Sequence, residues 1–257
     1  IAFTPVSETQ HHTILGISYL NGSKEQIVEA GLVRGLVVIP SAPVIVRIQE
    51  DAAHRDAVLN ADLAIIDSGL MVICWRLLTG EQLVRVSGLA YLKLLLADAR
   101  LRETGNLGWI MPSESARDIN LAWLRQFGHH TTEADCYVAP AYPKSGSLED
   151  KKLLDWLNQH QPKHLIVALG GGVQERLGWY LKQNLKFGLG IHCVGAAIGF
   201  LSGEQTSIPQ WADRFYLGWL FRCLRHPSRF IPRYVKAARL IPLLVRYRQK
   251  LPPLRSE

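Results

Sequence analysis

The residues best suited to chemistry in this sequence stand directly after short apolar runs. Asp67 follows the run 63–66, and three consecutive glycines, at positions 170–172, follow the run 164–169. A carboxylate at the end of a strand can act as a general base when an acceptor hydroxyl comes within hydrogen-bond reach. A glycine-rich turn lets backbone amides approach a ligand and presents a helix N-terminus to phosphate. The two features predict a general base and a phosphate-binding turn.

Each signal also has a structural explanation. Asp67 is followed by Ser68 and Gly69, and an Asp-Ser-Gly sequence is often a turn or a helix cap. The triple glycine lacks the G-x-G-x-x-G spacing and the lysine of a P-loop, which disfavours dinucleotide binding and nucleotide hydrolysis and leaves a purely structural turn open. Gln174 and Glu175, just inside the following helix, favour a functional turn.

The pattern of elements predicts an α/β fold that brings these residues together. Short β-branched runs alternate with longer amphipathic stretches, as in a Rossmann-like, largely parallel sheet with flanking helices. Ligands of such sheets bind outside the carboxyl ends of the strands. Arg85 could hold a diphosphate there by charge-assisted hydrogen bonds, or could be an ordinary surface residue. We expect one edge to carry the residues that follow the strands, namely Ser41, Asp67, the turn at 170–174 and Gly195.

The individual elements follow from hydrophobic periodicity and capping residues. Strands are expected at 13–19, 36–40, 63–66, 107–111, 164–169 and 190–194. Helices are expected at 23–35 with a serine N-cap, 44–59, 70–78, 113–127, 148–159 with a cap near Ser147, and 174–185. The stretch 138–145 is expected to be a loop.

Composition predicts a folded domain with an ample core. The chain has 257 residues, of which 48% are hydrophobic and 20% are charged, which is ordinary for a globular protein. The first ten residues lack the pattern of a signal peptide, and no run of about 18 apolar residues occurs. We therefore expect a cytoplasmic protein without a membrane-spanning helix.

No metal site is predicted. Four cysteines stand far apart without a CxxC pair, so neither a zinc site nor a disulfide framework is expected; they are Cys74, Cys136, Cys193 and Cys223. Two adjacent histidine pairs lack a third ligand at metal spacing; they are His11 with His12 and His129 with His130.

The C-terminal tail carries the positive charge of the chain. Residues 221–257 contain ten Arg or Lys against one acid, a charge of +9, so the other 220 residues sum to −2 of the net +7. Apolar and basic residues interleave at helical spacing, which is typical of helices in a membrane interface beside anionic headgroups. We expect a core at 1–207 and a helical membrane-docking appendage at 208–257. Nucleic-acid binding is the disfavoured alternative, because it rests on charge alone.

Several motifs, taken in order, resemble one family. They are NADLAIID at 60–67, RVSG at 85–88, LGGGVQE at 169–175, VGAAIGFLSG at 194–203 and IPQWADRFYLGWLFRCLRHPSRFIPRY at 208–234. On these motifs the chain from about Thr13 to Tyr234 resembles the WecG/TagA/CpsF family, glycosyltransferase family 26. The C-terminal motifs match best.

The resemblance implies a reaction. Members are inverting, metal-independent enzymes that commonly transfer N-acetylmannosamine from its UDP form to a polyprenyl-diphosphate-linked sugar in cell-envelope polysaccharide or exopolysaccharide assembly. It implies no cofactor beyond the UDP-sugar donor substrate. It implies attachment to the inner face of the plasma membrane, and a homo-oligomer is plausible for such a fold.

The resemblance also implies roles for particular residues. Asp67 becomes the catalytic base, Ser41 lies beside the site, and Gln174 contacts the donor sugar or uracil. It makes Arg85 a diphosphate or acceptor contact. Together with the predicted edge it assigns further donor or diphosphate contacts to Gly170, Gly171, Gly172, Glu175 and Gly195. It assigns lipid-diphosphate or membrane contacts to Arg222, Arg225, Arg229 and Arg233.

The sequence departs from the family pattern at four positions. Ser68 and Gly218 replace a glycine and a glutamate, while Ala90 and Gly199 stand where the family has acids. These departures leave the donor sugar open, with glucose or a uronic acid as further candidates. They also leave open a scaffold that binds UDP-sugar without turnover.

Overall fold

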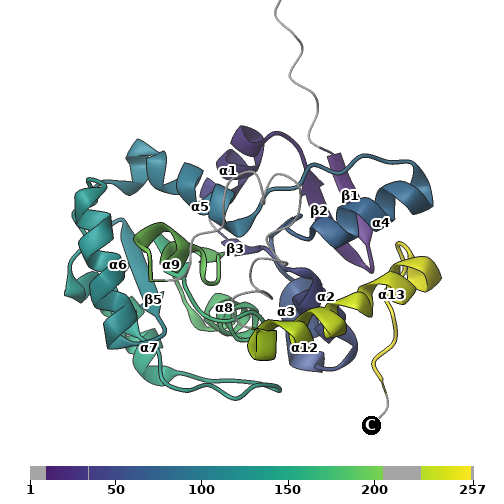
Figure 1. Ribbon diagram of the computed structural model, residues 1–257. Coiled ribbons are helices and arrows are strands. Elements are labelled where there is room, and N and C mark those ends of the chain that lie inside the picture. The colour runs from purple at the N-terminus through teal and green to yellow at the C-terminus, as the bar shows by residue number, and fades with distance from the viewer. Residues whose placement is uncertain (1–9, 34, 205–226, 256–257) are drawn as a thin grey trace, which may run out of the picture.

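The computed structural model describes residues 10–33, 35–204 and 227–255 (Figure 1). Their strands are β1 (Gln10–Ile14), β2 (Ile17–Asn21), β3 (Gly35–Val38), β4 (Leu63–Ile65), β5 (Leu107–Met111), β6 (Cys136–Val138), β7 (His164–Val167) and β8 (Gly190–Cys193). Their α-helices are α1 (Lys24–Leu32), α2 (Ala42–Val46), α3 (Ala52–Leu59), α4 (Gly69–Thr79), α5 (Gly88–Ala97), α6 (Glu114–Gln126), α7 (Lys151–His160), α8 (Val173–Asn184), α9 (Ala197–Ser202), α12 (Pro227–Ala238) and α13 (Leu240–Tyr247). Short 3₁₀ turns are η1 (Arg47–Gln49), η2 (Ala99–Leu101) and η3 (Glu133–Asp135).

The strands form one sheet that confirms the predicted α/β fold. Their order is β1-β2-β4-β3-β8-β7-β5-β6. Only β1 pairs antiparallel, with β2, while the other described pairings are parallel. Parallel strands need crossover connections, and the helices between them supply these.

Helices cover both faces of the sheet, as its sequence requires. Leu36 and Val38 of β3 are buried in one core with residues of α8 and α13, whereas Val37 and Ile39 are buried in the other core with residues of α5. In Figure 1, α1 and α5 lie on one side of the sheet, and α3 and α8 lie on the other. Because both faces are covered, the central strands are mostly apolar, apart from the buried His164 and His192.

The expected first strand, 13–19, is wrong, because this stretch is a hairpin. Leu15 and Gly16 both have positive φ and form a tight turn between β1 and β2. A leucine in such a turn is unusual. The C-terminal segment stabilises it, since the amides of Leu15 and Gly16 donate to the carbonyls of Arg248 and Gln249 at 2.7 and 3.0 Å. A contact so distant in sequence leaves no local signal.

Two expected helices also differ. The helix at 44–59 is divided into α2, η1 and α3, because Asp51 takes an extended conformation and its carboxylate caps α3 by accepting from the amide of His54. Helix α7 begins after Asp150, not near Ser147, since the Asp150 carboxylate accepts from the amide of Leu153. The expected helix at 23–35 is confirmed as α1, with Ser23 as its N-cap. Strand β6 and helices α5 and α9 were not predicted.

Most of the described tail is helical and packs on the core. Helix α13 contacts α4 and α2, and α12 contacts α2. Apolar residues on one face of these helices are buried, namely Ala237, Leu240, Leu243 and Leu244. Others stay exposed, namely Ile231, Val235, Ile241 and Val245. In the described ranges, no helix combines the length and the apolar character needed to cross a membrane.

Replacing Leu244 with alanine should therefore destabilise the whole domain. Leu244 is fully buried, and removing such a side chain costs about 2–5 kcal/mol of the free energy of unfolding. The matched control is Ile241→Ala on the exposed side of the same helix, with an expected effect of about 0.5 kcal/mol or less. Urea denaturation measures both. Equal small effects would show that α13 does not belong to the core.

Candidate active site

The four central strands end level, which brings the predicted residues to one edge of the sheet. Val38 pairs with Cys193, and Cys193 pairs with Val167, while Val38 also pairs with Ala64 of β4. All four strands run parallel, so one rim carries the residues that follow β4, β3, β8 and β7, namely Asp67, Ser41, Gly195 and Gly170. Strands β4 and β7 are three inter-strand spacings apart, or about 14 Å. Asp67 and the glycine turn therefore stand at opposite ends of this rim.

Asp67 is fixed by Arg85. The Arg85 Nε donates to the Asp67 carbonyl at 2.6 Å, and its Nη2 lies 3.6 Å from Asp67 Oδ1. Both side chains are partly exposed, Asp67 at 23% and Arg85 at 18%. The N-cap of α4 is Ser68, whose Oγ accepts from the amide of Met71. The Asp67 carboxylate is therefore not the cap of α4.

The segment 85–88 extends from Asp67 toward β8. The amide of Val86 donates to the carbonyl of Ile66 at 2.8 Å, and Ser87 caps α5. A Cβ on Gly88 would lie 3.3 Å from the carbonyl oxygen of Val194, which is tight. A glycine at this position lets the start of α5 approach the end of β8.

The triple-glycine turn is organised by its own helix. Gly172 has φ 93° and donates its amide to Glu175 Oε2 at 2.5 Å. The amides of Val173 and Gln174 both reach the carbonyl of Gly170 at 3.2 Å. The N-terminus of α8, which the sequence suggested as a phosphate site, thus already holds a carboxylate. Gly170 faces open space, because a Cβ there would meet no atom within 4 Å.

Gln174 and Glu175 support the rim. Gln174 Oε1 accepts from the amide of Gly195 at 2.7 Å, and its Nε2 donates to Glu175 Oε1 at 3.0 Å. Their side chains are buried, Gln174 at 4% exposure and Glu175 at 0%. This chain of bonds joins the glycine turn to the end of β8. Direct donor contacts for the two residues stay a prediction.

Two arginines that were not predicted from the sequence contact the triple-glycine turn. Arg176 is 3% exposed and donates to the carbonyls of Gly172 at 2.7 Å, Pro143 at 2.6 Å and Gly146. Burial lowers the pKa of Arg176, although Asp51, 3.8 Å away, opposes this. The sequence signal that could have identified Arg176 is its position directly after Gln174 and Glu175. Arg47, the C-cap of α2, touches the same turn.

The cationic tail approaches the rim through α12. This helix packs against α2, whose N-cap is Ser41. Arg233 and the backbone of Arg229 belong to α12, while Arg222 and Arg225 lie outside the described residues. Lys236 of α12 and Arg239 pair with Glu50 at 2.5 and 3.3 Å.

The described residues contain no group of three or more His, Cys, Asp or Glu side chains that could hold a metal ion. His12 instead contacts Glu81 at 3.1 Å, and His129 contacts the carbonyl of Leu96 at 3.0 Å. Both histidines are therefore engaged within the fold.

Glu175→Gln should destabilise the protein by about 1–3 kcal/mol. An amide nitrogen would face the Gln174 Nε2 donor, or the Gly172 amide, in place of an accepting oxygen. Glu25→Gln is the matched control, since Glu25 is exposed in the first turn of α1 and should change stability by about 0.5 kcal/mol or less. Thermal and urea denaturation measure both. Equal effects would mean that the buried carboxylate does not hold the turn.

Comparison with known proteins identifies the family of the chain. No curated protein is similar enough to the chain to match it. The model of the glycosyl transferase WecG/TagA/CpsF family matches residues 12–254, nearly the whole chain. With this match, the chain belongs to the WecG/TagA/CpsF family of glycosyltransferases.

Proposed function

We propose that the protein transfers a sugar from a UDP-sugar to a polyprenyl-diphosphate-linked saccharide, with Asp67 as the general base. Its family gives it a sugar-transferase role in envelope polysaccharide synthesis. One observation carries the finer proposal: Asp67 and the glycine turn lie on one rim, about 14 Å apart, with Ser41 and Gly195 between them. An extended nucleotide sugar can bridge such a distance, whereas a single sugar ring cannot.

The proposed reaction is one inverting displacement. Asp67 accepts the proton of the acceptor hydroxyl as that oxygen attacks the anomeric carbon. The bond between the anomeric carbon and the diphosphate oxygen breaks, and its electron pair leaves with UDP. Fixed backbone amides and arginines meet the charge that develops on the leaving diphosphate, so the proposal needs no cofactor and no metal.

Ser41 and Gly195 support the middle of this donor site. Ser41 caps α2 without a side-chain cap bond. Gly195 has φ 62°, and the amide of Gly195 is held by Gln174. We assign the nucleotide end of the donor to the glycine turn and the sugar end to Asp67. Arg85 then orients the backbone at the base, while N-acetylmannosamine, glucose and a uronic acid remain candidate sugars.

The tail is proposed to meet an anionic membrane at the inner face of the plasma membrane. Helices α12 and α13 contain no acidic residue. Their exposed apolar residues Ile231 and Val235 lie among the cations Arg233 and Arg239. Apolar and cationic surface together favour an anionic headgroup layer. There the lipid diphosphate of the acceptor is within reach of the tail arginines.

A scaffold without turnover is the alternative, motivated by the missing family acids. One of the residues that depart from the family pattern, Ser68, has a structural role, because it is the N-cap of α4. Ala90 lies in the first turn of α5, and Gly199 is buried in α9. Gly218 lies outside the described residues. An assay of UDP release distinguishes the scaffold from the enzyme.

Asp67→Asn should lower transfer by about 10²- to 10⁴-fold, the usual contribution of a general base. The assay measures UDP release from a panel of UDP-sugars with and without a polyprenyl-diphosphate sugar. Asp56→Asn, an exposed change on α3, should leave transfer unchanged. An Asp67→Asn enzyme of full activity would refute the base assignment. A wild-type protein that binds UDP-sugars but releases no UDP with any donor and acceptor would favour the scaffold.

The double variant Ile231→Glu, Val235→Glu should lose binding to phosphatidylglycerol vesicles in flotation. Both residues are exposed, at 50% and 68%, and each change places an acid in the proposed headgroup layer. Val33→Glu is the matched control, because Val33 is 70% exposed just after α1 and should not affect flotation. If the double variant floats like the wild type, the exposed side of α12 does not face the membrane.

A further inference from the structure

We propose that Arg47 binds the diphosphate of the donor at the glycine turn, a role that the family resemblance assigns to Arg85. The inference rests on the proposed function, because it presupposes a nucleoside diphosphate on this rim. Three amides at the start of α8 are already occupied, and the two arginines beside the turn differ in exposure.

The glycine turn cannot bind a diphosphate with its helix amides alone. A helix N-terminus attracts anions through its first amides and its dipole. Here the Glu175 carboxylate occupies the amide of Gly172, and the Gly170 carbonyl occupies the next two amides. A buried negative charge also offsets the positive end of the dipole. These three amides are therefore not free for a diphosphate, and a cationic side chain beside the turn would supply further donors.

Of the two arginines at the turn, Arg176 is buried away from any ligand. Its Nε and both terminal nitrogens donate to the carbonyls of Gly172, Gly146 and Pro143. Its side chain is 2% exposed. Its hydrogen bonds join the turn to the loop 139–149, and its buried guanidinium is not accessible to a ligand. Arg176 is a positioning residue.

Arg47 lies against the turn and is partly exposed. Its Nη1 donates to the Gly171 carbonyl at 3.3 Å, and its Nη2 donates to the Lys144 carbonyl and lies 3.9 Å from Asp51 Oδ2. A guanidinium has five N–H donors, and these two carbonyls take two of them. The side chain of Arg47 is 23% exposed. A partly exposed planar fork suits phosphate oxygens.

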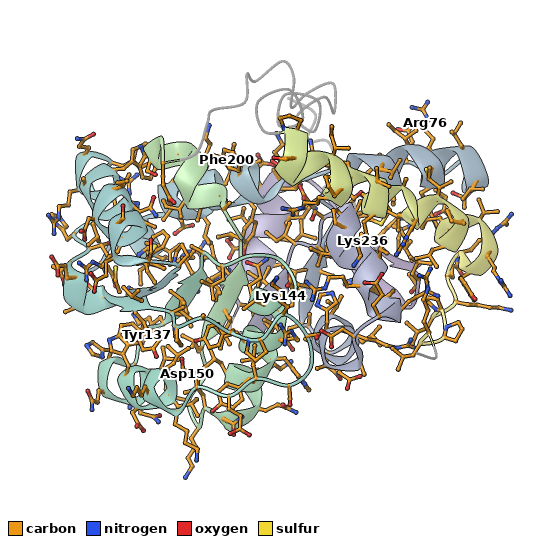
Figure 2. All side chains as sticks on the ribbon, turned by 60° about the horizontal axis from the view of Figure 1, so that its bottom comes forward. Arg76, Tyr137, Lys144, Asp150, Phe200 and Lys236 are labelled. Atoms are coloured by element: carbon orange, nitrogen blue, oxygen red, sulfur yellow. The ribbon has the colours of Figure 1, made fainter. Side chains whose placement is uncertain are left out.

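The glycines of the turn make this approach possible. A Cβ on Gly172 would sit 2.1 Å from Arg47 Nη1 and 2.6 Å from its Cζ, so only glycine leaves room for the guanidinium. Lys144 lies on the long loop between β6 and α7, as labelled in Figure 2, and its carbonyl fixes the other side of the fork. The turn and the loop together hold Arg47 in place.

Arg85 is less suited to this role. Its Nε donates to the Asp67 carbonyl at 2.6 Å, and its Nη2 faces the Asp67 carboxylate. It stands at the sugar end of the rim, three strands away from the glycine turn. Arg47 therefore binds the diphosphate, and Arg85 positions the base, Asp67.

The test compares UDP with uridine, because only UDP carries the diphosphate. Calorimetry gives the Kd of each ligand for the wild type, for Arg47→Ala and for Arg125→Ala, an exposed control at the end of α6. We expect Arg47→Ala to weaken UDP binding about tenfold or more while the Kd of uridine stays the same. Arg125→Ala should change neither. Arg47→Lys, which keeps the charge without the fork, should lose part of the affinity for UDP.

The outcomes separate this inference from the proposed function. A wild type that binds UDP no more tightly than uridine contradicts the UDP-sugar donor itself. A wild type that prefers UDP, with the same preference in Arg47→Ala, overturns the role of Arg47 alone. An equal loss of both ligands also overturns it, because it shows Arg47 to be structural.

A second measurement needs no variant and covers a variant that fails to fold. Phenylglyoxal modifies exposed guanidinium groups, and peptide mass spectrometry reports the rate at each arginine of the wild type. We expect UDP, but not uridine, to slow modification of Arg47 and to leave Arg125 unaffected. Equal rates at Arg47 with and without saturating UDP would overturn the proposal.

Discussion

The parallel register of β4, β3, β8 and β7 is the constraint on which the site depends. Because these strands end level, residues from positions 41 to 195 of the chain meet on one rim. A shift of one residue in a strand would turn its apolar side chains to the other face and move the residue at its end. Burial of both faces opposes such a shift, so the cores fix the site geometry.

A buried polar network refines what the strands position. Glu175, Gln174 and the amide of Gly195 link the glycine turn to β8, and Arg176 with Arg47 links the turn to the loop 139–149. Most of these bonds are buried or part-buried, where an unpaired partner is costly. The network therefore keeps the turn in one shape and leaves Gly170 open. We propose that this network supports the glycine turn and that Arg47, beside the turn, contacts the ligand.

The sequence allowed the fold class, most central strands and the shared rim to be predicted, because alternation and strand-end positions are local signals. It did not show that Leu15 lies in a turn, since that turn depends on the backbone of residues 248 and 249. It did not show that Ser68 would cap α4 and release Asp67 from that role, because Asp and Ser are both good caps. Nor did it single out Arg47, whose importance appears only when α2 is packed beside the glycine turn.

The described tail changes how the C-terminal region is understood. Its apolar residues fall into two groups. Leu240 and Leu244 are buried in the core, whereas Ile231 and Val235 are exposed. Hydrophobic periodicity alone could not separate these sets. The contact of α12 with α2 also places the tail beside the helix that begins after Ser41 on the rim.

The most direct test of the account is a crystal structure with a non-transferable UDP-sugar analogue bound. The account predicts the diphosphate between the glycine turn and Ser41, with the anomeric carbon facing Asp67 closely enough for an acceptor hydroxyl to bridge them. A nucleotide bound away from this rim, or a sugar that points away from Asp67, would contradict it.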